Sequence, residues 1–582
     1  MSRRVAVIDR NLCTHVKCGY VCEKVCPVNR MGQDCILTEK DSVFPSISEE
    51  LCIGCGICVR KCPMSCIWII NLAKEAGDPI YQYGINTFRL YGLPLPKDGA
   101  VSLVGKNGIG KTTALRLLSH QFSPNFAIFD KKLSEKEILE KLPLETRRYI
   151  QQTGKEIRVS MKPQYVDKLR SAFKGKVKDL LLEVCGKASL PKVSKLFNIS
   201  AILDRDVSNL SGGELQKTAI AVAYLKDADI YYFDEPTNYL DIEERLRIAV
   251  VLKELAESKK VMLAEHDMII LDYVSSYVYL FYGDENVYGV VSGIKNVRAG
   301  LNEYISGFLK EENVKFRERE LKFLSHSEGE IKSPVKLKYG ALGKSFGKDF
   351  VFSSKGGEIR EGEILGLVGK NALGKSLFIK MLAGVENPDN GEGGTFRVSY
   401  KPQYISADDV IVAEMFRSQS LDGAVFEEAK RRLSIGGFME KKLTELSGGE
   451  LQRVALALAI SREADVYLFD EPSAFLDIEQ RFAFAELLRH VIAESRKSAF
   501  VVDHDIVFID SIANRLIVFD GESSVKGHAS APMDKRKGMN SFLKITGITL
   551  RRDKDTKRPR INKPDSALDR EQKEKGEYYY TL

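Results

Sequence analysis

The sequence has no long apolar run, a single tryptophan and, beyond residue 68, only one cysteine. A membrane-spanning helix needs about 20 consecutive apolar residues, so the sequence predicts none. The amino terminus, Met1-Ser2-Arg3-Arg4, leads into a short strand-like stretch that ends at Asp9, so no secretory signal is predicted. We therefore expect a soluble, intracellular chain. Its 582 residues are enough for three or four domains, at about 150 residues each.

The charge balance is mild, with 87 Lys and Arg against 80 Asp and Glu and a net charge of +7. This excess implies only weak attraction to polyanions. Basic residues do gather in two places, where they suit phosphate backbones, although a solvated charged surface is the alternative. The two groups are Lys315, Arg317 and Arg319, and Arg551, Arg552, Lys554, Lys557, Arg558 and Arg560.

Ten of the eleven cysteines lie before Trp68, and Cys185 is the other one. Disulfides are not expected in a large intracellular chain, so metal binding is the better interpretation. Two runs each end in Cys-Pro. The second has the C-x2-C-x2-C-x3-C-P spacing of bacterial ferredoxins with two [4Fe–4S] clusters, whereas the first is more loosely spaced. The runs are Cys13, Cys18, Cys22 and Cys26, and Cys52, Cys55, Cys58 and Cys62.

Thiolates suit iron–sulfur clusters because ligand and metal are both soft. In such ferredoxins the fourth cysteine of each run binds the other cluster. Paired zinc sites are the alternative, but zinc favours two ligands from each of two segments. Cys35 and Cys66 are left over and are expected to be small buried apolar residues. The predicted ligand sets are Cys13, Cys18, Cys22 and Cys62 for one cluster, and Cys26, Cys52, Cys55 and Cys58 for the other.

Two segments match the phosphate-binding pattern G-x-x-x-x-G-K-[ST]. Each follows an apolar strand, at 101–104 and 364–368, and leads into a predicted helix. In that setting the loop amides cradle phosphates, the lysine reaches the β- and γ-phosphates, and the hydroxyl binds Mg²⁺. The residues are Gly105, Lys106, Asn107, Gly108, Ile109, Gly110, Lys111, Thr112 and the adjoining Thr113, and Gly369, Lys370, Asn371, Ala372, Leu373, Gly374, Lys375 and Ser376.

Three further motifs recur downstream of each phosphate loop. A Leu-Ser-Gly-Gly-Glu-Leu-Gln segment introduces a helix, an apolar strand then ends in Asp-Glu, and a His-Asp pair follows the next strand. The aspartate can hold Mg²⁺ through water, the glutamate can orient or deprotonate the attacking water, and the histidine can sense the γ-phosphate. The motifs begin at Leu210 and Leu446, at Asp234-Glu235 and Asp470-Glu471, and at His266 and His504.

This set resembles the ABC ATPase family across both halves of the chain. The resemblance implies two cassettes that face each other head to tail, so that Lys111 shares a site with Ser447, and Lys375 with Ser211. It also implies ATP contacts for Gly213 and Gly449. Two matching Lys-Pro-Gln-Tyr segments supply glutamines expected to contact ATP and Mg²⁺, and these are Gln164 and Gln403.

The spacing of these motifs indicates a duplicated unit with one insertion. Ser447 follows Ser211 by 236 residues, and the two Asp-Glu pairs have the same offset. The phosphate loops are 264 residues apart, whereas the two glutamines are only 239 apart. The first half therefore carries about 25 extra residues around 130–156. We expect two charged helices there, broken near Leu142-Pro143, which form either a partner-contacting arm or a surface decoration.

A second repeat, Gly300–Ile305 and Gly538–Leu543, lies outside the ATPase motifs. Together with the cysteine runs, the insertion and the tail Arg558–Lys563, it makes the chain resemble the RNase L inhibitor family. The resemblance implies two tandem ABC-type domains of α/β class, preceded by a small α+β ferredoxin-like domain with two [4Fe–4S] clusters. The expected bounds are 1–75 for the iron–sulfur domain, 76–295 for the first ABC domain, 296–330 for a hinge, 331–528 for the second ABC domain, and 529–582 for a second hinge and C-terminal strap.

This E-type ABC group of eukaryotes and archaea is known as the ribosome recycling factor. The resemblance implies an ATPase that splits ribosomes into subunits after termination or rescue, with Glu235, Glu471, His266 and His504 as catalytic residues. Its cofactors would be two clusters and Mg²⁺–ATP at two sites. Implied partners are both ribosomal subunits, a release factor or Pelota-like factor, and translation initiation factors. The chain would act as a monomer in the cytoplasm, with the nucleus as a second location.

Two other functions compete with this interpretation. One is an ATP-dependent binding or inhibitor protein for a ribonuclease or initiation factors, which the intact Lys111, Lys375 and both glutamates argue against. The other is an iron–sulfur carrier ATPase, but eight well-spaced cysteine ligands favour permanent clusters.

Three positions depart from the family pattern, namely Ala372, Asn238 and Lys217. Ala372 replaces a phosphate-loop glycine, and its methyl group would crowd the loop if φ must be positive. We expect adenine to stack on Tyr83 in the first cassette, and on Tyr339 or Phe346 in the second.

Overall fold

The computed structural model describes residues 3–10, 12–38, 43–72, 77–153, 156–184, 186, 189–323, 333–347, 350–391, 396–403 and 409–579. Cys185 and the predicted boundaries near 75 and 330 lie outside these residues. Within them, no helix is long and apolar enough to cross a membrane. The chain forms two compact units: unit 1 is Met1–Pro236, Val250–His266 and Val274–Glu320, and unit 2 is Thr237–Ala249, Asp267–Tyr273 and Leu321–Leu582.

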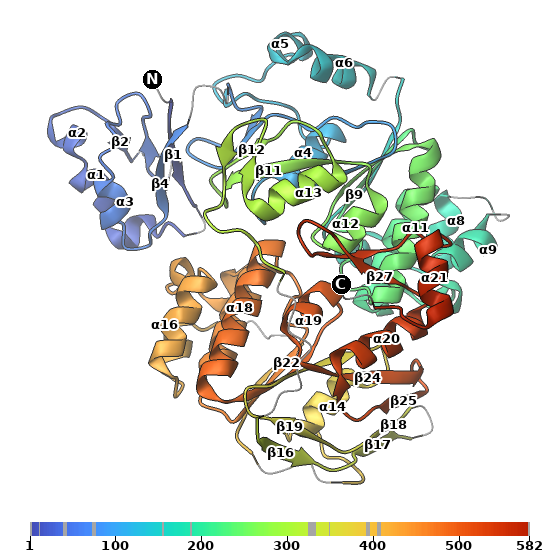
Figure 1. Cartoon of the computed structure of the whole chain (residues 1–582). Helices are drawn as coiled ribbons and strands as arrows, with labels where there is room; N and C mark the ends of the chain where they lie inside the picture. The colour runs from blue at the N-terminus through green and yellow to red at the C-terminus, as the bar shows by residue number, and fades with distance from the viewer. Residues whose placement is uncertain are drawn as a thin grey trace. The chain divides into compact units, whose positions relative to one another are not determined.

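The amino-terminal segment of unit 1 is a small α+β domain, drawn in blue in Figure 1. Successive strand side chains point to opposite faces, so Ala6 and Ile8 enter a cysteine-rich core while Val5 and Val7 pack beside Tyr91. The elements are antiparallel β1 (Arg3–Ile8) and β4 (Ile67–Leu72), antiparallel β2 (Ile36–Leu37) and β3 (Ser46–Ile47), a 3-10 helix (His15–Cys18), α1 (Val21–Val25), α2 (Pro27–Arg30) and α3 (Ile57–Lys61).

Polar contacts join this domain to the sheet that follows it. The Asn86 side chain accepts a hydrogen bond from the Ile47 amide at 2.8 Å and donates to the Ala6 carbonyl at 3.0 Å. Arg89 forms an ion pair with Glu49 at 2.5 Å. Asn86 and Arg89 are both buried, so these bonds form in a setting where unpaired polar groups would be costly.

The first cassette contains a nine-stranded sheet with strand order β5-β6-β12-β11-β7-β10-β9-β8, and β13 pairs with β11. Strands β11, β7, β10, β9 and β8 run parallel. The bounds are β5 (Tyr81–Gln82), β6 (Arg89–Tyr91), β7 (Ala100–Val104), β8 (Val159–Lys162), β9 (Ile230–Asp234), β10 (Lys260–Ala264), β11 (Tyr277–Asp284), β12 (Tyr288–Val291) and β13 (Lys295–Asn296).

The second cassette repeats that strand order as β17-β18-β25-β24-β20-β23-β22-β21, with β26 beside β24. The duplicated unit read from the motif spacing is therefore also a structural repeat. The bounds are β17 (Gly343–Phe346), β18 (Phe350–Ser354), β20 (Ile364–Val368), β21 (Val398–Lys401), β22 (Val466–Asp470), β23 (Ser498–Val502), β24 (Arg515–Glu522), β25 (Lys526–Ala529) and β26 (Met533–Asp534). Two small antiparallel pairs lie outside these sheets, β14 (Phe308–Leu309) with β15 (Val314–Lys315), and β16 (Val335–Tyr339) with β19 (Gly357–Arg360).

Helices cover these sheets and position the functional loops. In each cassette a helix begins at the phosphate-loop lysine, and another follows the Ser-Gly-Gly motif. The bounds are α4 (Lys111–Leu118), α7 (Lys168–Ala172), α8 (Val177–Val184), α9 (Leu190–Leu196), α10 (Gly212–Leu225), α11 (Ile242–Ser258), α12 (Met268–Val274), α13 (Val297–Ser306), α14 (Lys375–Leu382), α15 (Val412–Arg417), α16 (Gly423–Arg432), α17 (Gly448–Ser461), α18 (Ile478–Ser495), α19 (Ile506–Ile512) and α20 (Lys535–Thr546).

The segment predicted to be an insertion forms helices α5 (Glu135–Lys141) and α6 (Leu144–Gln152), with Pro143 between them (Figure 1). Ser134 and Glu137 form a capping box at the start of α5. The hydroxyl of the half-buried Tyr149 donates to the Leu118 carbonyl at 3.1 Å, which ties α6 to the end of the phosphate-loop helix.

The C-terminal segment forms β27 (Leu550–Arg552), β28 (Pro559–Ile561) and α21 (Ala567–Lys575). Arg558 is fully buried and pairs with Asp272 at 3.2 Å, while Arg560 pairs with the same carboxylate at 2.5 Å. Arg552 pairs with Asp510 at 2.7 Å. The interpretation of these three arginines as phosphate-binding residues is therefore wrong, because their charges are already neutralised inside the protein.

Candidate ATP and iron–sulfur sites

Each phosphate loop wraps around its own lysine. The Lys111 ammonium group donates to the carbonyls of Gly105 and Lys106, at 2.8 and 2.6 Å. Lys375 makes the equivalent bonds in the second cassette, and its burial lowers its pKa to about 8. The ammonium group thus sits among the loop carbonyls at a helix start, where backbone amides and the helix dipole favour an anion.

The second phosphate loop accommodates the alanine that departs from the glycine pattern. Ala372 has φ of 58°, so the predicted conflict between a methyl group and a positive φ is present. A Cβ at Gly108, the matching position, would lie 2.5 Å from the side-chain oxygen of Asn286. Ser524 takes the place of Asn286 in the second cassette and donates its amide to the Ala372 carbonyl at 3.0 Å. Its shorter side chain explains how the methyl group fits.

Both predicted catalytic glutamates have an unusual backbone. Glu235 follows β9 and Glu471 follows β22, and each has φ of 48°. A non-glycine residue in this left-handed region has a strained backbone, and strained residues cluster at functional sites.

In the first cassette, side chains predicted from separate motifs meet at Glu235. Gln164 donates to the Glu235 carboxylate at 2.8 Å, and the His266 ring lies 3.6 Å from the same oxygen. Burial opposes ionisation, but these contacts outweigh it, above all the one with His266, and lower the pKa of Glu235 to about 2. The glutamate is therefore ionised at neutral pH and able to accept a hydrogen bond from a water molecule.

The second cassette repeats this arrangement around Glu471. Gln403 donates to its carboxylate at 2.8 Å, and the His504 ring lies 3.5 Å away. Burial again opposes ionisation, and the contacts with His504 and Gln403 lower the pKa of Glu471 to about 2.

The aspartates of the two Asp-Glu pairs are more deeply buried than the glutamates, and their pKa values shift in the opposite direction. Burial raises the pKa of Asp234 and of Asp470 to about 6. The hydroxyl of Thr112 contacts Asp234, and that of Ser376 contacts Asp470. A carboxylate and a hydroxyl side by side are the oxygen donors that Mg²⁺ takes in this setting, and a bound cation would keep the aspartates ionised.

Two residues of each cassette hold the glutamate backbone, and the sequence did not assign them this role. Gln216 donates to the carbonyls of Glu235 and Pro236 at 2.7 and 2.8 Å. Lys162 donates to the carbonyls of Asp234 and Glu235 at 2.8 and 3.1 Å. Gln452 and Lys401 make the matching bonds in the second cassette. Their identical place in both repeats was the available signal.

The Ser-Gly-Gly serines cap helices α10 and α17. Ser211 accepts from the Glu214 amide at 3.3 Å, and Ser447 accepts from the Glu450 amide at 3.4 Å. Each capping box leaves the helix start at the surface, since both serines are exposed. The expected pairing of Lys111 with Ser447, and of Lys375 with Ser211, remains a prediction because the partners belong to different units.

The aromatic residues predicted to stack on adenine differ in exposure. Tyr83 is 50% exposed and bonds to the Thr113 hydroxyl at 2.9 Å. Tyr339 is 6% exposed and packs against Phe378 and Phe500 in the core, whereas Phe346 is 46% exposed. Burial removes Tyr339 from consideration and leaves Phe346 as the candidate in the second cassette.

Unit 2 also contains the loop that follows the first Asp-Glu pair. There the Asp241 carboxylate accepts a hydrogen bond from the Asn371 amide at 2.8 Å, and Glu243 pairs with Lys370 at 2.6 Å. Contacts with the Glu244 and Asn371 amides overcome burial and lower the pKa of Asp241. Residues after the first Asp-Glu pair thus contact the second phosphate loop.

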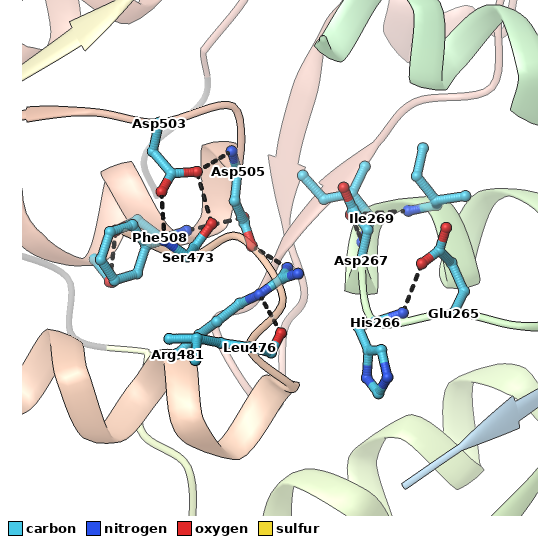
Figure 2. A network of polar contacts seen from close by, with 12 residues as sticks. Glu265, His266, Asp267, Ile269, Ser473, Leu476, Arg481, Asp503, Asp505 and Phe508 are labelled. Atoms are coloured by element: carbon cyan, nitrogen blue, oxygen red, sulfur yellow. Dashed lines mark hydrogen bonds and ion pairs between the residues drawn. The ribbon is translucent and has the colours of Figure 1, made fainter. Parts of the chain in front are cut away.

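A polar network joins the two loops that carry Glu471 and His504 (Figure 2). The Asp503 carboxylate accepts from the Ser473 hydroxyl at 2.7 Å, the Ser473 amide at 2.9 Å and the Asp505 amide at 2.8 Å. Asp505 in turn pairs with Arg481 at 2.6 Å. Because Asp503 precedes His504 and Ser473 follows Glu471 closely, this network fixes the histidine relative to the glutamate.

We expect Ser473→Ala and Asp503→Asn to lower the turnover number of the second cassette about tenfold, because a hydrogen bond to a charged group is worth about 1.5–3 kcal/mol. The KM for ATP should stay within about twofold. Steady-state kinetics in a Glu235→Gln background would isolate this cassette. Ser530→Ala, which removes a hydroxyl bond to the Val518 amide, is the control. A rise in KM without loss of turnover would contradict the positioning role.

The cysteines of the amino-terminal domain separate into two groups. Cys22 faces Cys13, Cys18 and Cys62, and burial, reinforced by their charges, raises its pKa to about 12. Burial together with the charges of Cys52, Cys55 and Cys26 raises the pKa of Cys58 to about 11. Each group combines three cysteines of one run with the fourth cysteine of the other, which is the grouping that the spacing predicts. The ligand sets themselves remain a prediction.

These groups fit clusters better than single ions. Among the described residues, no three His, Cys, Asp or Glu side chains converge closely enough to hold one metal ion. Zinc sites take two ligands from each of two segments, whereas each of these groups combines three cysteines of one run with one of the other, as in ferredoxins with two [4Fe–4S] clusters. The donors are all sulfur, as such clusters require.

Comparison with known proteins agrees with this geometry. Residues 91–238 and 356–474 match the ABC transporter family. Residues 3–34 match a family described as a possible Fer4-like domain in RNase L inhibitor, and residues 45–68 match the 4Fe-4S binding domain family. The expected fold class, two ABC domains after a ferredoxin-like domain, is therefore confirmed.

Relatives match over almost the whole chain. An uncharacterized ABC transporter ATP-binding protein of Methanocaldococcus jannaschii is 45% identical, over 99% of this chain and 97% of its own. The translation initiation factor RLI1 of Saccharomyces cerevisiae is 40% identical, over 99% and 98%.

Solved structures agree over similar lengths. A ribosome-bound assembly of archaeal Pelota and ABCE1 contains a chain with a TM-score of 0.92 and 44% identity, covering all of both chains. The archaeal recycling factor aABCE1 in complex with the ribosomal stalk protein aP1 has a TM-score of 0.81 and 44% identity, over 87% of this chain and 99% of its own. The chain belongs to the RNase L inhibitor family, the ABC ATPases that carry an amino-terminal iron–sulfur domain.

Proposed function

We propose that this protein is a ribosome recycling factor, an ATPase that splits ribosomes into large and small subunits after termination or rescue. The full-length similarity to ABCE1 in its ribosome-bound assembly with Pelota carries this proposal. The ABC domains and the ionised glutamate of each cassette support an enzyme that hydrolyses ATP.

Each cassette would bind one Mg²⁺–ATP. The phosphate loop would hold the phosphates, with Mg²⁺ at Thr112 and Asp234 in the first cassette and at Ser376 and Asp470 in the second. The glutamate would orient the attacking water, and the histidine would contact the γ-phosphate. The contact of Asp241 with the second phosphate loop supports head-to-tail closure, in which each Ser-Gly-Gly loop completes the opposite site.

The amino-terminal domain would hold two [4Fe–4S] clusters on the two sets of four cysteines. The polar contacts through Asn86 and Arg89 would transmit movement of the first cassette to this domain. Closure of the cassettes would then press the domain against a release factor or Pelota-like factor. The bounds 1–75, 76–295, 296–330, 331–528 and 529–582 remain our proposed domain division.

Partners beyond the ribosome follow from the relatives. The name of the yeast relative, translation initiation factor RLI1, supports a second role with initiation factors. The arm α5–α6 and the hinges would contact the small subunit, and the complex of aABCE1 with the stalk protein aP1 supports a large-subunit contact. Such partners support a cytoplasmic location, and we propose the nucleus as a second one.

Sedimentation of ribosomes tests the proposed function directly. Purified full-length protein with ATP and a Pelota-like factor should convert most 70S or 80S particles into free subunits within minutes. A chain carrying Glu235→Gln and Glu471→Gln, which binds ATP without hydrolysing it, separates binding from repeated turnover and should split at most one ribosome per chain. Particles that stay intact with the active ATPase present would refute the proposal.

A further inference from the structure

The amino-terminal domain contains more cysteines than two clusters need. Eight of its ten cysteines form the two ligand sets, which leaves Cys35 and Cys66. Both are 2% exposed. The expectation that they are ordinary core residues accounts for their burial, but it does not explain which side chains they contact.

Cys66 lies beside two ligands of the first cluster. Its sulfur is 3.4 Å from the sulfur of Cys62, and it also hydrogen-bonds to Cys13. Cys66 is therefore in direct contact with one ligand from each cysteine run.

Cys35 has the matching place at the second cluster. Its thiol lies in the same core cluster as those of Cys26 and Cys52 and next to both. In both groups the extra cysteine contacts the same two kinds of ligand, namely the first cysteine of one run and the fourth cysteine of the other. Chance burial of two spare cysteines would not produce this correspondence.

We propose that Cys66 and Cys35 are reserve ligands, each able to replace either of the two cluster ligands that it contacts. A change of side-chain rotamer moves a cysteine sulfur by about 3 Å, which is comparable to the 3.4 Å between Cys66 and Cys62. The entering thiol would lose its proton to solvent and bind iron as a thiolate. The charge and composition of the cluster would stay unchanged, since one thiolate replaces another.

The proposal rests on the proposed two-cluster content, and it predicts which cysteines can be removed. Cys62→Ala and Cys13→Ala should keep the first cluster through Cys66. Cys22→Ala, whose position has no reserve ligand in this scheme, should lose it. At the second cluster, Cys52→Ala should keep the cluster through Cys35, and Cys58→Ala should lose it.

Anaerobic reconstitution of the full-length protein with ferrous iron and sulfide tests this pattern. Bound iron, acid-labile sulfide and absorbance near 400 nm would be measured after removal of free metal. We expect Cys62→Ala to retain iron close to the wild-type amount, and Cys22→Ala to retain about half. The double variant Cys62→Ala with Cys66→Ala should also fall to about half, whereas Cys66→Ala alone should retain the full amount.

Two results would overturn the inference alone. One is loss of half the iron from Cys62→Ala, as from Cys22→Ala. The other is a full complement of iron in the double variant, which would mean that another group replaces Cys62. ATP binding measured on every variant shows that the rest of the chain is folded. A wild-type chain that takes up no iron would instead refute the cluster content itself, and this inference with it.

Discussion

We expect a chain carrying Glu471→Gln to hydrolyse ATP in its second cassette at least a hundredfold more slowly than the wild type, while it still binds ATP. General base and water-orienting residues contribute about 10²–10⁴ to a rate. The substitution keeps the size of the side chain but removes the negative charge that Gln403 and His504 stabilise. Phosphate release in a single turnover, with nucleotide binding measured in parallel, checks both parts of this expectation.

The duplicated architecture supplies an internal comparison for this experiment. Glu235→Gln removes the same charge in the first cassette, where Gln164 and His266 make the corresponding contacts. Glu463→Gln, which alters only an exposed ion pair with Arg397, should leave turnover unchanged. Normal hydrolysis in both Glu235→Gln and Glu471→Gln chains would show that neither glutamate has the proposed role.

Substitution of Cys58 should separate ATP hydrolysis from ribosome splitting. Cys58 is 5% exposed, lies in the apolar core of the amino-terminal domain and faces Cys52, Cys55 and Cys26. Its loss removes a ligand that neither Cys35 nor Cys66 contacts in this structure. We expect Cys58→Ser to bind about half the wild-type iron and to split ribosomes at least tenfold more slowly.

The ATPase rate of the same variant, measured without ribosomes, should stay within about twofold of wild type because both phosphate loops are untouched. Lys61→Ala, an exposed neighbour, is the control for local disturbance. Sedimentation of subunits and an ATPase assay on one preparation give both readouts. Wild-type splitting by Cys58→Ser, despite the lost iron, would show that the proposed force-transmitting role of this domain is wrong.

Much of this molecule is predictable from sequence because its chemistry lies in short, contiguous motifs. The phosphate loop, the Asp-Glu pair and the His-Asp pair each have a geometry set mainly by neighbouring residues, so their patterns identify them. The spacing of the cysteine runs likewise predicts how the ligands group. The approach of Gln164 and His266 to Glu235 is also expected, because parallel strands end at one edge of a sheet.

The contacts that sequence reasoning missed join residues whose proximity depends on packing. In the sequence, nothing distinguishes Lys162 and Gln216 from other residues of their motifs. Only the folded chain brings them to the Glu235 backbone. The same is true of Asp503 and Ser473, whose side chains meet between two loops. The arginines of the tail show the opposite error, because a basic cluster in sequence reveals nothing about the buried carboxylates that neutralise it.

The pairing of residue 372 with residue 524 constrains how the two halves of a duplicated chain can diverge. An asparagine at position 524, like Asn286 in the first half, would stand where the Ala372 methyl group needs space. A small residue at position 524 is tolerated while position 372 is a glycine. An alanine at position 372, in contrast, is destabilising while position 524 is an asparagine. The two substitutions are therefore tolerated in one order only. The small residue at position 524 has to arise before the alanine at position 372.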